Sequence, residues 1–164
     1  MTSNALLWYI ELEWRTKDYN TLKILIKPWN EAQTEAFFIR SEVFIKEQRV
    51  PAELELDEFD LSASHALAYQ GERCVGTGRL VHLGNCHAQI GRMAVLAQFR
   101  GKGMGKQILR RLIDLAKLEG VSSLILHSQL AATPFYEKLG FQAEGSSYEE
   151  AGIPHRNMIL LLQK

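Results

Sequence analysis

A glycine-rich and basic segment, RGKGMGK at residues 100–106, has the residue types of an anion-binding loop. Glycines at alternate positions let the backbone approach a ligand closely and point several N–H groups into one concavity. Arg100, Lys102 and Lys106 crowd the start of the helix that we expect to follow, where positive charge opposes the helix macrodipole. A bound polyphosphate would reverse the sign of that cost, so we predict a phosphate site here. A solvated basic turn is the alternative interpretation.

Two common phosphate-binding motifs do not fit this loop. A Walker A motif, G-x-x-x-x-G-K-[ST], would need a glycine at Arg100 and a serine or threonine at Gln107. A dinucleotide-binding fingerprint, G-x-G-x-x-G, would need a glycine at Lys106 or at Ile108. We therefore predict that the loop binds a phosphate-bearing ligand, but not through a Walker A or a dinucleotide-binding motif.

The pattern that does fit is R-x-x-G-x-G, formed by Arg100, Gly103 and Gly105. It resembles the coenzyme A pyrophosphate loop of the GNAT superfamily of N-acetyltransferases. This resemblance implies that acetyl-CoA is the ligand. It also implies that the cofactor-binding residues of the loop are Arg100, Gly101, Lys102, Gly103, Met104, Gly105 and Lys106.

A second segment, residues 129–141, resembles the GNAT pattern N-x-x-A-x-x-[FL]-Y-x-x-x-G-F, with Gln129 where asparagine is usual. The resemblance adds Gln129, Ala132 and Phe135 to the expected cofactor contacts. In the family, the tyrosine that matches Tyr136 is commonly the general acid. Coenzyme A leaves as a thiolate when an amine attacks the thioester, and a phenol can protonate that sulfur. A half-buried core tyrosine is the alternative interpretation.

The resemblance further implies a pair of strands that splay apart, here residues 88–96 and 122–127. In the family, the pantetheine arm of the cofactor lies between these strands. It pairs there with backbone groups, which in this chain are those of Met93, Ala94 and Val95. A backbone N–H at this place would stabilise the oxyanion of a tetrahedral intermediate.

An acidic segment, residues 55–60, carries the pattern E-x-D-x-x-D. With Arg40, Phe44, Arg79 and the G-I-P-H run that ends at His155, it resembles the ElaA-like branch of the superfamily. Several of these residues also resemble acyl-homoserine-lactone synthases, in which the acidic run belongs to the amine side of the site. Carboxylates hold an amine as a cation or draw off its proton. We therefore expect substrate contacts from Arg40, Glu55, Asp57, Arg79 and His155; a solvated acidic loop paired with the arginines is the alternative.

The elements that position these residues alternate between strands and helices, so we expect an α/β fold with a mixed sheet covered by helices. The resemblance makes this a GNAT arrangement of about six to seven strands and roughly four helices. The expected helices are 31–48, 103–119 and 134–139. The expected strands are 21–29, 65–69, 74–82, 88–96, 122–127, 141–148 and 157–162, the second and third forming a hairpin.

Composition bounds the class of protein. The 164 residues suit a single domain, with residues 1–20 as an N-terminal extension outside the resemblance. Lys+Arg and Asp+Glu are both 19, so no basic excess points to nucleic acid or a membrane surface. Two cysteines without a CxxC motif and five histidines without ligand spacing predict no disulfide framework and no metal. The apolar run at residues 5–10 is too short for a signal peptide or membrane span, which predicts a cytoplasmic protein.

Together these features predict an acetyl-CoA-dependent N-acetyltransferase. Direct attack of an amine on the thioester is favoured over a covalent acyl-enzyme, because neither cysteine lies in a motif. We expect a small amine-bearing acceptor rather than a protein. Three alternatives stay open: an acyl-homoserine-lactone-synthase-like acyltransferase, a non-catalytic acyl-CoA binding module, and an enzyme that modifies lysines or N-termini of proteins.

Overall fold

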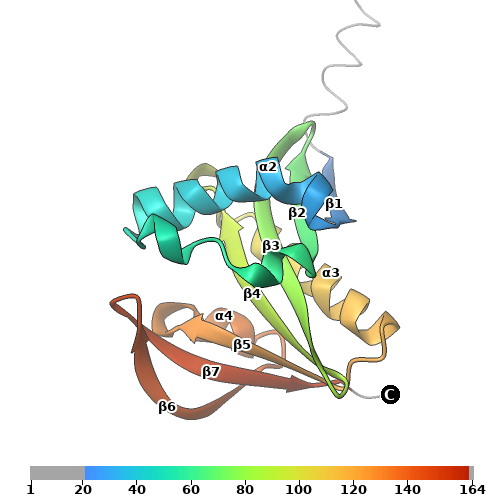
Figure 1. Ribbon diagram of the computed structural model, residues 1–164, viewed down its shortest axis with the longest axis vertical. Coiled ribbons are helices and arrows are strands. Elements are labelled where there is room, and N and C mark those ends of the chain that lie inside the picture. Colours follow the sequence, from blue (N-terminus) through green and yellow to red (C-terminus); the bar gives the residue numbers. More distant parts are fainter. Residues whose placement is uncertain (1–20, 163–164) are drawn as a thin grey trace, which may run out of the picture.

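A computed structural model describes residues 21–162; the predicted N-terminal extension, residues 1–20, lies outside the described residues. Seven strands form one mixed sheet in the order β1-β2-β3-β4-β5-β7-β6 (Figure 1). Their bounds are β1 Leu22–Lys27, β2 Ser64–Gln70, β3 Arg73–Gly84, β4 His87–Val95, β5 Ser123–Gln129, β6 Gln142–Glu150 and β7 Ile153–Leu161. All neighbours pair antiparallel except β4 and β5, which are parallel. The predicted mixed α/β architecture is confirmed.

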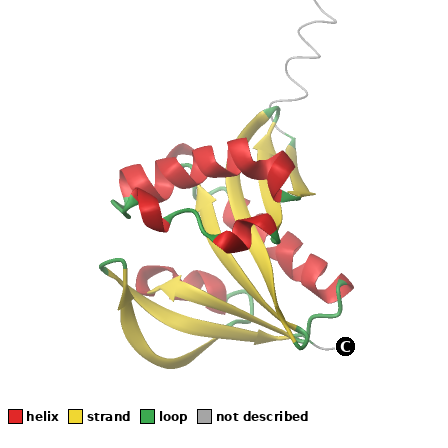
Figure 2. Cartoon of the chain, viewed as in Figure 1, coloured by secondary structure: helices red, strands yellow, loops and turns green. Residues whose placement is uncertain are grey.

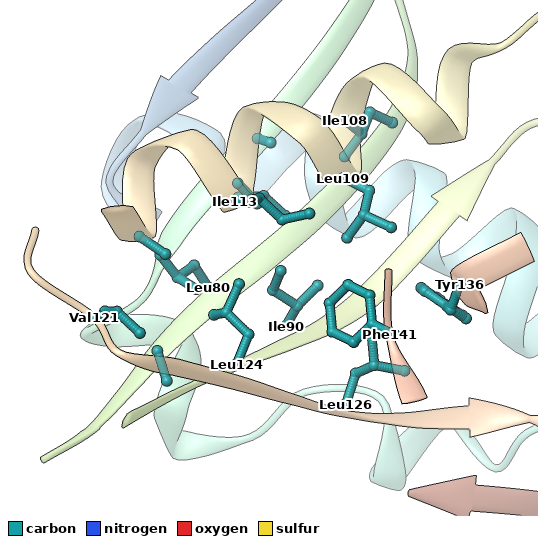
Figure 3. Packing of buried hydrophobic residues seen from close by; sticks show 14 of the residues in the cluster. Leu80, Ile90, Ile108, Leu109, Ile113, Val121, Leu124, Leu126, Tyr136 and Phe141 are labelled. Carbon is teal, nitrogen blue, oxygen red and sulfur yellow. The ribbon is translucent and has the colours of Figure 1, made fainter. Parts of the chain in front are cut away.

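Three α-helices occur within residues 21–162, together with short 3-10 turns (Figure 2). They are α2 (Trp29–Arg40), α3 (Met104–Leu118) and α4 (Thr133–Glu137). The helices lie on both faces of the sheet, and each face has its own hydrophobic core: α2 packs in one core, while α3 and α4 pack in the other. Figure 3 shows this second core, with α3 leucines and isoleucines facing Leu80, Ile90 and Leu124 of the sheet.

The predicted continuous helix 31–48 is two elements. Helix α2 begins earlier, at Trp29 directly after Pro28, and passes into the π-helix η1 (Ser41–Glu47). The change is visible in the hydrogen bonds, because the N–H of Gln48 donates to the carbonyl five residues back, on Val43, at 3.1 Å. A π-turn inserts an extra residue per turn, and such turns are frequent at functional sites.

Helix α3 follows its sequence pattern closely. Ile108, Leu109 and Leu112 are fully buried against the sheet, as the three- and four-residue spacing predicts. The helix comes unusually near β3, because a Cβ atom on Gly78 would lie 2.6 Å from the Met93 sulfur and 2.8 Å from Ile108. This close packing fixes the height of α3, and hence of the loop at its start, above the sheet.

Strands β4 and β5 splay apart, as the resemblance implied. They pair only between His87–Gln89 and Ser123–Ile125. Beyond these residues the strands separate, which Figure 1 shows as a widening gap between the yellow and orange strands. The divergence leaves backbone groups of both strands without a sheet neighbour, at the centre of the molecule.

Candidate functional site

Two cavities meet at the splay between β4 and β5. The first has a volume of about 500 Å³ and lies between β4, β5, the η1 end and the β6–β7 hairpin. The second, of about 540 Å³, runs along the glycine-rich loop towards α4. Six residues line both cavities, so the two spaces are continuous there: Met93, Ala94, Val95, Arg100, Ala132 and Tyr136.

The glycine-rich loop is open towards the second cavity. Gly101 and Gly103 have φ angles of +74° and +80°. This left-handed conformation is strained for a residue that carries a side chain. A Cβ atom on either would meet nothing within 4 Å, so the backbone conformation, and not crowding inside the chain, requires glycine. No side chain caps the start of α3 at Gly103. Its first N–H groups therefore keep their capacity to bind an anion, beside the exposed Lys106.

Arg100, which sequence reasoning assigned to phosphate binding, is held by other groups. Its Nη1 and Nη2 each lie 2.7 Å from an oxygen of Glu47, and its Nε donates to the Val95 carbonyl at 2.8 Å. The hydrogen bonds from Arg100 are the main reason that the pKa of Glu47 is lowered. Arg100 thus ties the loop to η1, at the wall of the first cavity. A direct phosphate contact would require its guanidinium to leave Glu47.

Tyr136 lies where the two cavities join. Its ring packs edge-on against Phe135 and Phe141, with centroid distances of 5.0 and 6.0 Å. Figure 3 shows Tyr136 near Phe141. Burial raises its pKa to about 12, so the phenol keeps its proton throughout the neutral range. A protonated phenol at the end of an open cleft can donate to a leaving group. Tyr136, which the sequence predicted as the general acid, thus lines both cavities in its protonated form.

The remaining residues of that segment also face the cavities. Ala132 lines both, and Phe135 lines the second. The Gln129 amide donates to Gln48 Oε1 at 2.8 Å, across the first cavity from β5 to the end of η1. This hydrogen bond ties the end of β5 to the end of η1 above the splay.

Three arginines and three carboxylates close into a ring of alternating charge beside the first cavity. The Arg79–Asp57 link is bidentate, at 2.6 and 2.9 Å, and the longest link, from Arg92 Nε to Glu55 Oε1, is 3.9 Å. In order around the ring, the members are Arg40, Glu55, Arg92, Asp57, Arg79 and Asp60, which returns to Arg40. Equal numbers of charges of each sign compensate one another within this charge ring.

The charge ring leaves few of its polar atoms free. Burial by itself would raise the pKa of Asp60, but the hydrogen bonds and charges of Arg40 and Arg79 outweigh it and hold that pKa below its usual range. Burial would likewise raise the pKa of Asp57, but Arg79 and Arg92 outweigh it and lower that pKa. Among the described residues, the ring atoms that are buried without a hydrogen-bond partner are Glu55 Oε2 and Arg79 Nε. Both of those residues line the first cavity, whereas Arg40 and Asp57 do not.

Sequence reasoning missed Arg92. This residue has a left-handed φ of +52° in the middle of β4, and its guanidinium donates to the Leu54 and Glu55 carbonyls at 3.1 Å. It therefore holds the acidic segment over the cleft. A lone arginine in a predicted strand carries no signal of this role.

His155 lies in the wall of the first cavity, as a predicted site residue on β7. It is 9% exposed, and its Nδ1 lies 2.7 Å from the Ile153 carbonyl. Its ring stacks on Tyr148 with centroids 6.1 Å apart. Of all the predicted site residues, those that line neither cavity are Lys102, Arg40 and Asp57.

Among residues 21–162, no group of three or more His, Cys, Asp or Glu side chains is placed to hold a metal ion. No helix in that part of the chain combines the length and the apolar character that crossing a membrane demands.

Comparison with known proteins gives consistent matches. The sequence model of the acetyltransferase (GNAT) domain matches residues 16–162. An uncharacterized N-acetyltransferase of Bacillus subtilis, YjcF, is 38% identical over 84% of this chain and 99% of its own length. A candidate N-acetyltransferase from Lactobacillus plantarum superposes with a TM-score of 0.80 and 27% identity, covering 88% of this chain and all of that one. Escherichia coli ElaA shares the fold, with a TM-score of 0.76 at 23% identity over 85% of this chain and 99% of its own.

Proposed function

The chain belongs to the GNAT acetyltransferase family, and we propose on that basis that it transfers an acetyl group from acetyl-CoA to an amine. The observation that carries the proposal is the meeting of two cavities at the β4–β5 splay, with a buried, protonated tyrosine at the junction. One cavity suits a long phosphate-bearing donor and the other an acceptor. The reacting atoms would meet beside Tyr136.

Support for the donor position comes from the loop. The uncapped start of α3 and the open space over Gly101 and Gly103 suit the pyrophosphate of coenzyme A. Lys106, which lines the second cavity, supplies positive charge, while Arg100 holds the loop against Glu47. The pantetheine arm would lie between the splayed strands, against the backbone of residues 93–95.

Chemistry at the junction needs a proton for the departing sulfur. Tyr136 is proposed as its donor, because the residue lines both cavities and its phenol is protonated at neutral pH. Direct attack by the amine needs no nucleophile from the chain. Cys74 is buried, and burial is the main reason that its thiol pKa is raised to about 12, so Cys74 is a poor nucleophile.

We propose a small amine as the acceptor, since a cavity of about 500 Å³ suits a small molecule. Glu55 and Arg79 are the proposed contacts from the charge ring, each with an unpartnered polar atom. His155 contributes to the same wall. Arg40 and Asp57 are proposed to act indirectly, by holding the acidic segment in place.

An acyl-homoserine-lactone-synthase-like activity is the second candidate, because the charge ring contains the residues on which that resemblance depends. Free-thiol detection after mixing the protein with acetyl-CoA and a panel of amines tests the main proposal. Amine-dependent thiol release supports it. Turnover only with donors on acyl-carrier protein would favour the second candidate, and slow hydrolysis without amine dependence would indicate a binding module.

A further inference from the structure

The cleft-facing side of β5, β6 and β7 carries a cluster of polar side chains, and two of them have no role in the mechanism proposed above. His127 on β5 and Glu150 on β6 both line the first cavity, with His155 beside them. In the pairing register Tyr148 lies opposite His155, and Glu150 is two residues further along β6, so the three side chains share one face. Polar side chains gather here on the wall opposite the charge ring.

His127 and Glu150 are in ion-pair contact. The His127 Nδ1 lies 3.4 Å from Glu150 Oε2, and the two side chains are 41% and 49% exposed. The Tyr148 ring meets the His127 ring edge-on, with centroids 6.1 Å apart. If a neutral His127 carries its proton on Nδ1, next to this carboxylate, its Nε2 lone pair is left to accept a proton. This is the arrangement in which a carboxylate orients a histidine base.

The other groups around His127 do not compete for that role. Burial, and then the charge of Glu150, raise the pKa of Tyr148, which stays a neutral phenol. The Nδ1 of His155 lies against the neutral Ile153 carbonyl. Across the cavity, Arg92 and Glu55 belong to the charge ring, whose charges compensate. Glu150 is therefore the charged group that directs the His127 ring.

We propose that His127 is the base that takes a proton from the acceptor ammonium, and that Glu150 is its positioning residue. The inference rests on the proposed function and deepens it. An N–H bond of the ammonium breaks and the proton goes to Nε2. The freed nitrogen lone pair forms the bond to the thioester carbonyl carbon. The carbon–sulfur bond then breaks as the sulfur takes the proton of Tyr136, and the second proton lost by the nitrogen restores the phenol. The acceptor class is accordingly an alkylamine that is protonated at neutral pH.

The test compares two probe amines with acetyl-CoA as donor. n-Butylamine is an ammonium at neutral pH and needs a base, whereas aniline is already a neutral amine. His127→Ala should lower kcat/KM for n-butylamine by about 100-fold, the low end for a general base, and for aniline by less than about 5-fold. Without the base, kcat/KM for n-butylamine should follow the free-amine fraction, which changes by about tenfold per pH unit across the neutral range. Glu150→Gln should lower kcat for n-butylamine by about 10-fold, with KM unchanged.

Glu149→Gln is the matched control, because it removes the same charge one residue away, on the opposite face of β6. Glu149→Gln should leave kcat/KM unchanged for both amines. Equal losses for the two amines in His127→Ala, or none, would overturn the proposal. A selective loss of kcat/KM for n-butylamine in His155→Ala, with no such loss in His127→Ala, would overturn the proposal and assign the base to His155. If the wild type releases no thiol with either amine, the proposed function itself fails.

Discussion

Replacing Arg40 with methionine tests how strongly the charge ring holds the acidic segment over the cleft. The Arg40 side chain is 1% exposed, and it donates to Glu55 and to both oxygens of Asp60, at 2.8 and 3.0 Å. Methionine keeps an unbranched apolar chain but removes the charge and the donors. Breaking a buried ion pair from one side costs about 3–5 kcal/mol.

We expect the lower end of that range, about 3 kcal/mol of unfolding free energy, because two arginines remain. Arg79 still lies 2.8 Å from Asp60, and Arg92 still faces Glu55 at 3.9 Å. In a chain of this size, such a loss corresponds to a fall in Tm of about 6–12 °C.

The loss should also depend on pH in a defined direction. In the folded wild type, the arginines hold the pKa of Asp60 below its ordinary value of 3.8 despite burial. A depressed folded pKa contributes stability that is fully present above the unfolded pKa and is lost as pH falls through the folded one. The difference between wild type and Arg40→Met should therefore be largest near neutral pH and shrink below about pH 4.

Urea unfolding followed by circular dichroism, at several pH values, measures both quantities. Arg111→Met on the exposed face of α3 is the control, and it should change the free energy of unfolding by less than about 0.5 kcal/mol. A loss for Arg40→Met no greater than that of the control would refute the reasoning. So would a loss that stays constant into the acid range, since Asp60 would then not be coupled to Arg40.

Three further predictions concern the loop, the junction and the packing of α3. Gly103→Asp should abolish coenzyme A binding in calorimetry. Gly84→Asp is the control, because Gly84 shares a positive φ and open surroundings, and this variant should still bind coenzyme A. Equal binding in both variants would place the pyrophosphate elsewhere. Tyr136→Phe should lower kcat by about 100-fold or more with little change in cofactor affinity. If the variant loses only cofactor affinity, Tyr136 lines the pocket and is not the acid. Gly78→Ala should destabilise the fold by about 1–3 kcal/mol in urea unfolding, because of its contacts with Met93 and Ile108. Gly91→Ala, with nothing within 4 Å, is its control, and similar losses in both would argue against overpacking.

Local patterns in the sequence were sufficient for the elements of the fold. The apolar spacing of residues 103–119 and the cap at Gly120, with a φ of +75°, predicted α3 to within a residue at each end. The hairpin of β2 and β3 followed from a short polar loop between apolar runs. The helix predicted at 31–48 was wrong beyond Arg40, because apolar spacing alone does not distinguish a π-turn from the α-helix that precedes it.

The tertiary structure alone decided which groups the site residues meet. Arg100 and Glu47 are 53 positions apart, yet they form a bidentate ion pair that ties the loop to η1. The charge ring likewise joins α2, the acidic segment, β3 and β4. His127 and Glu150 come into contact although β7 lies between β5 and β6 in the sheet. Spacing constrains only residues within a turn or a strand of one another, whereas the order of strands and the packing of helices set every longer contact.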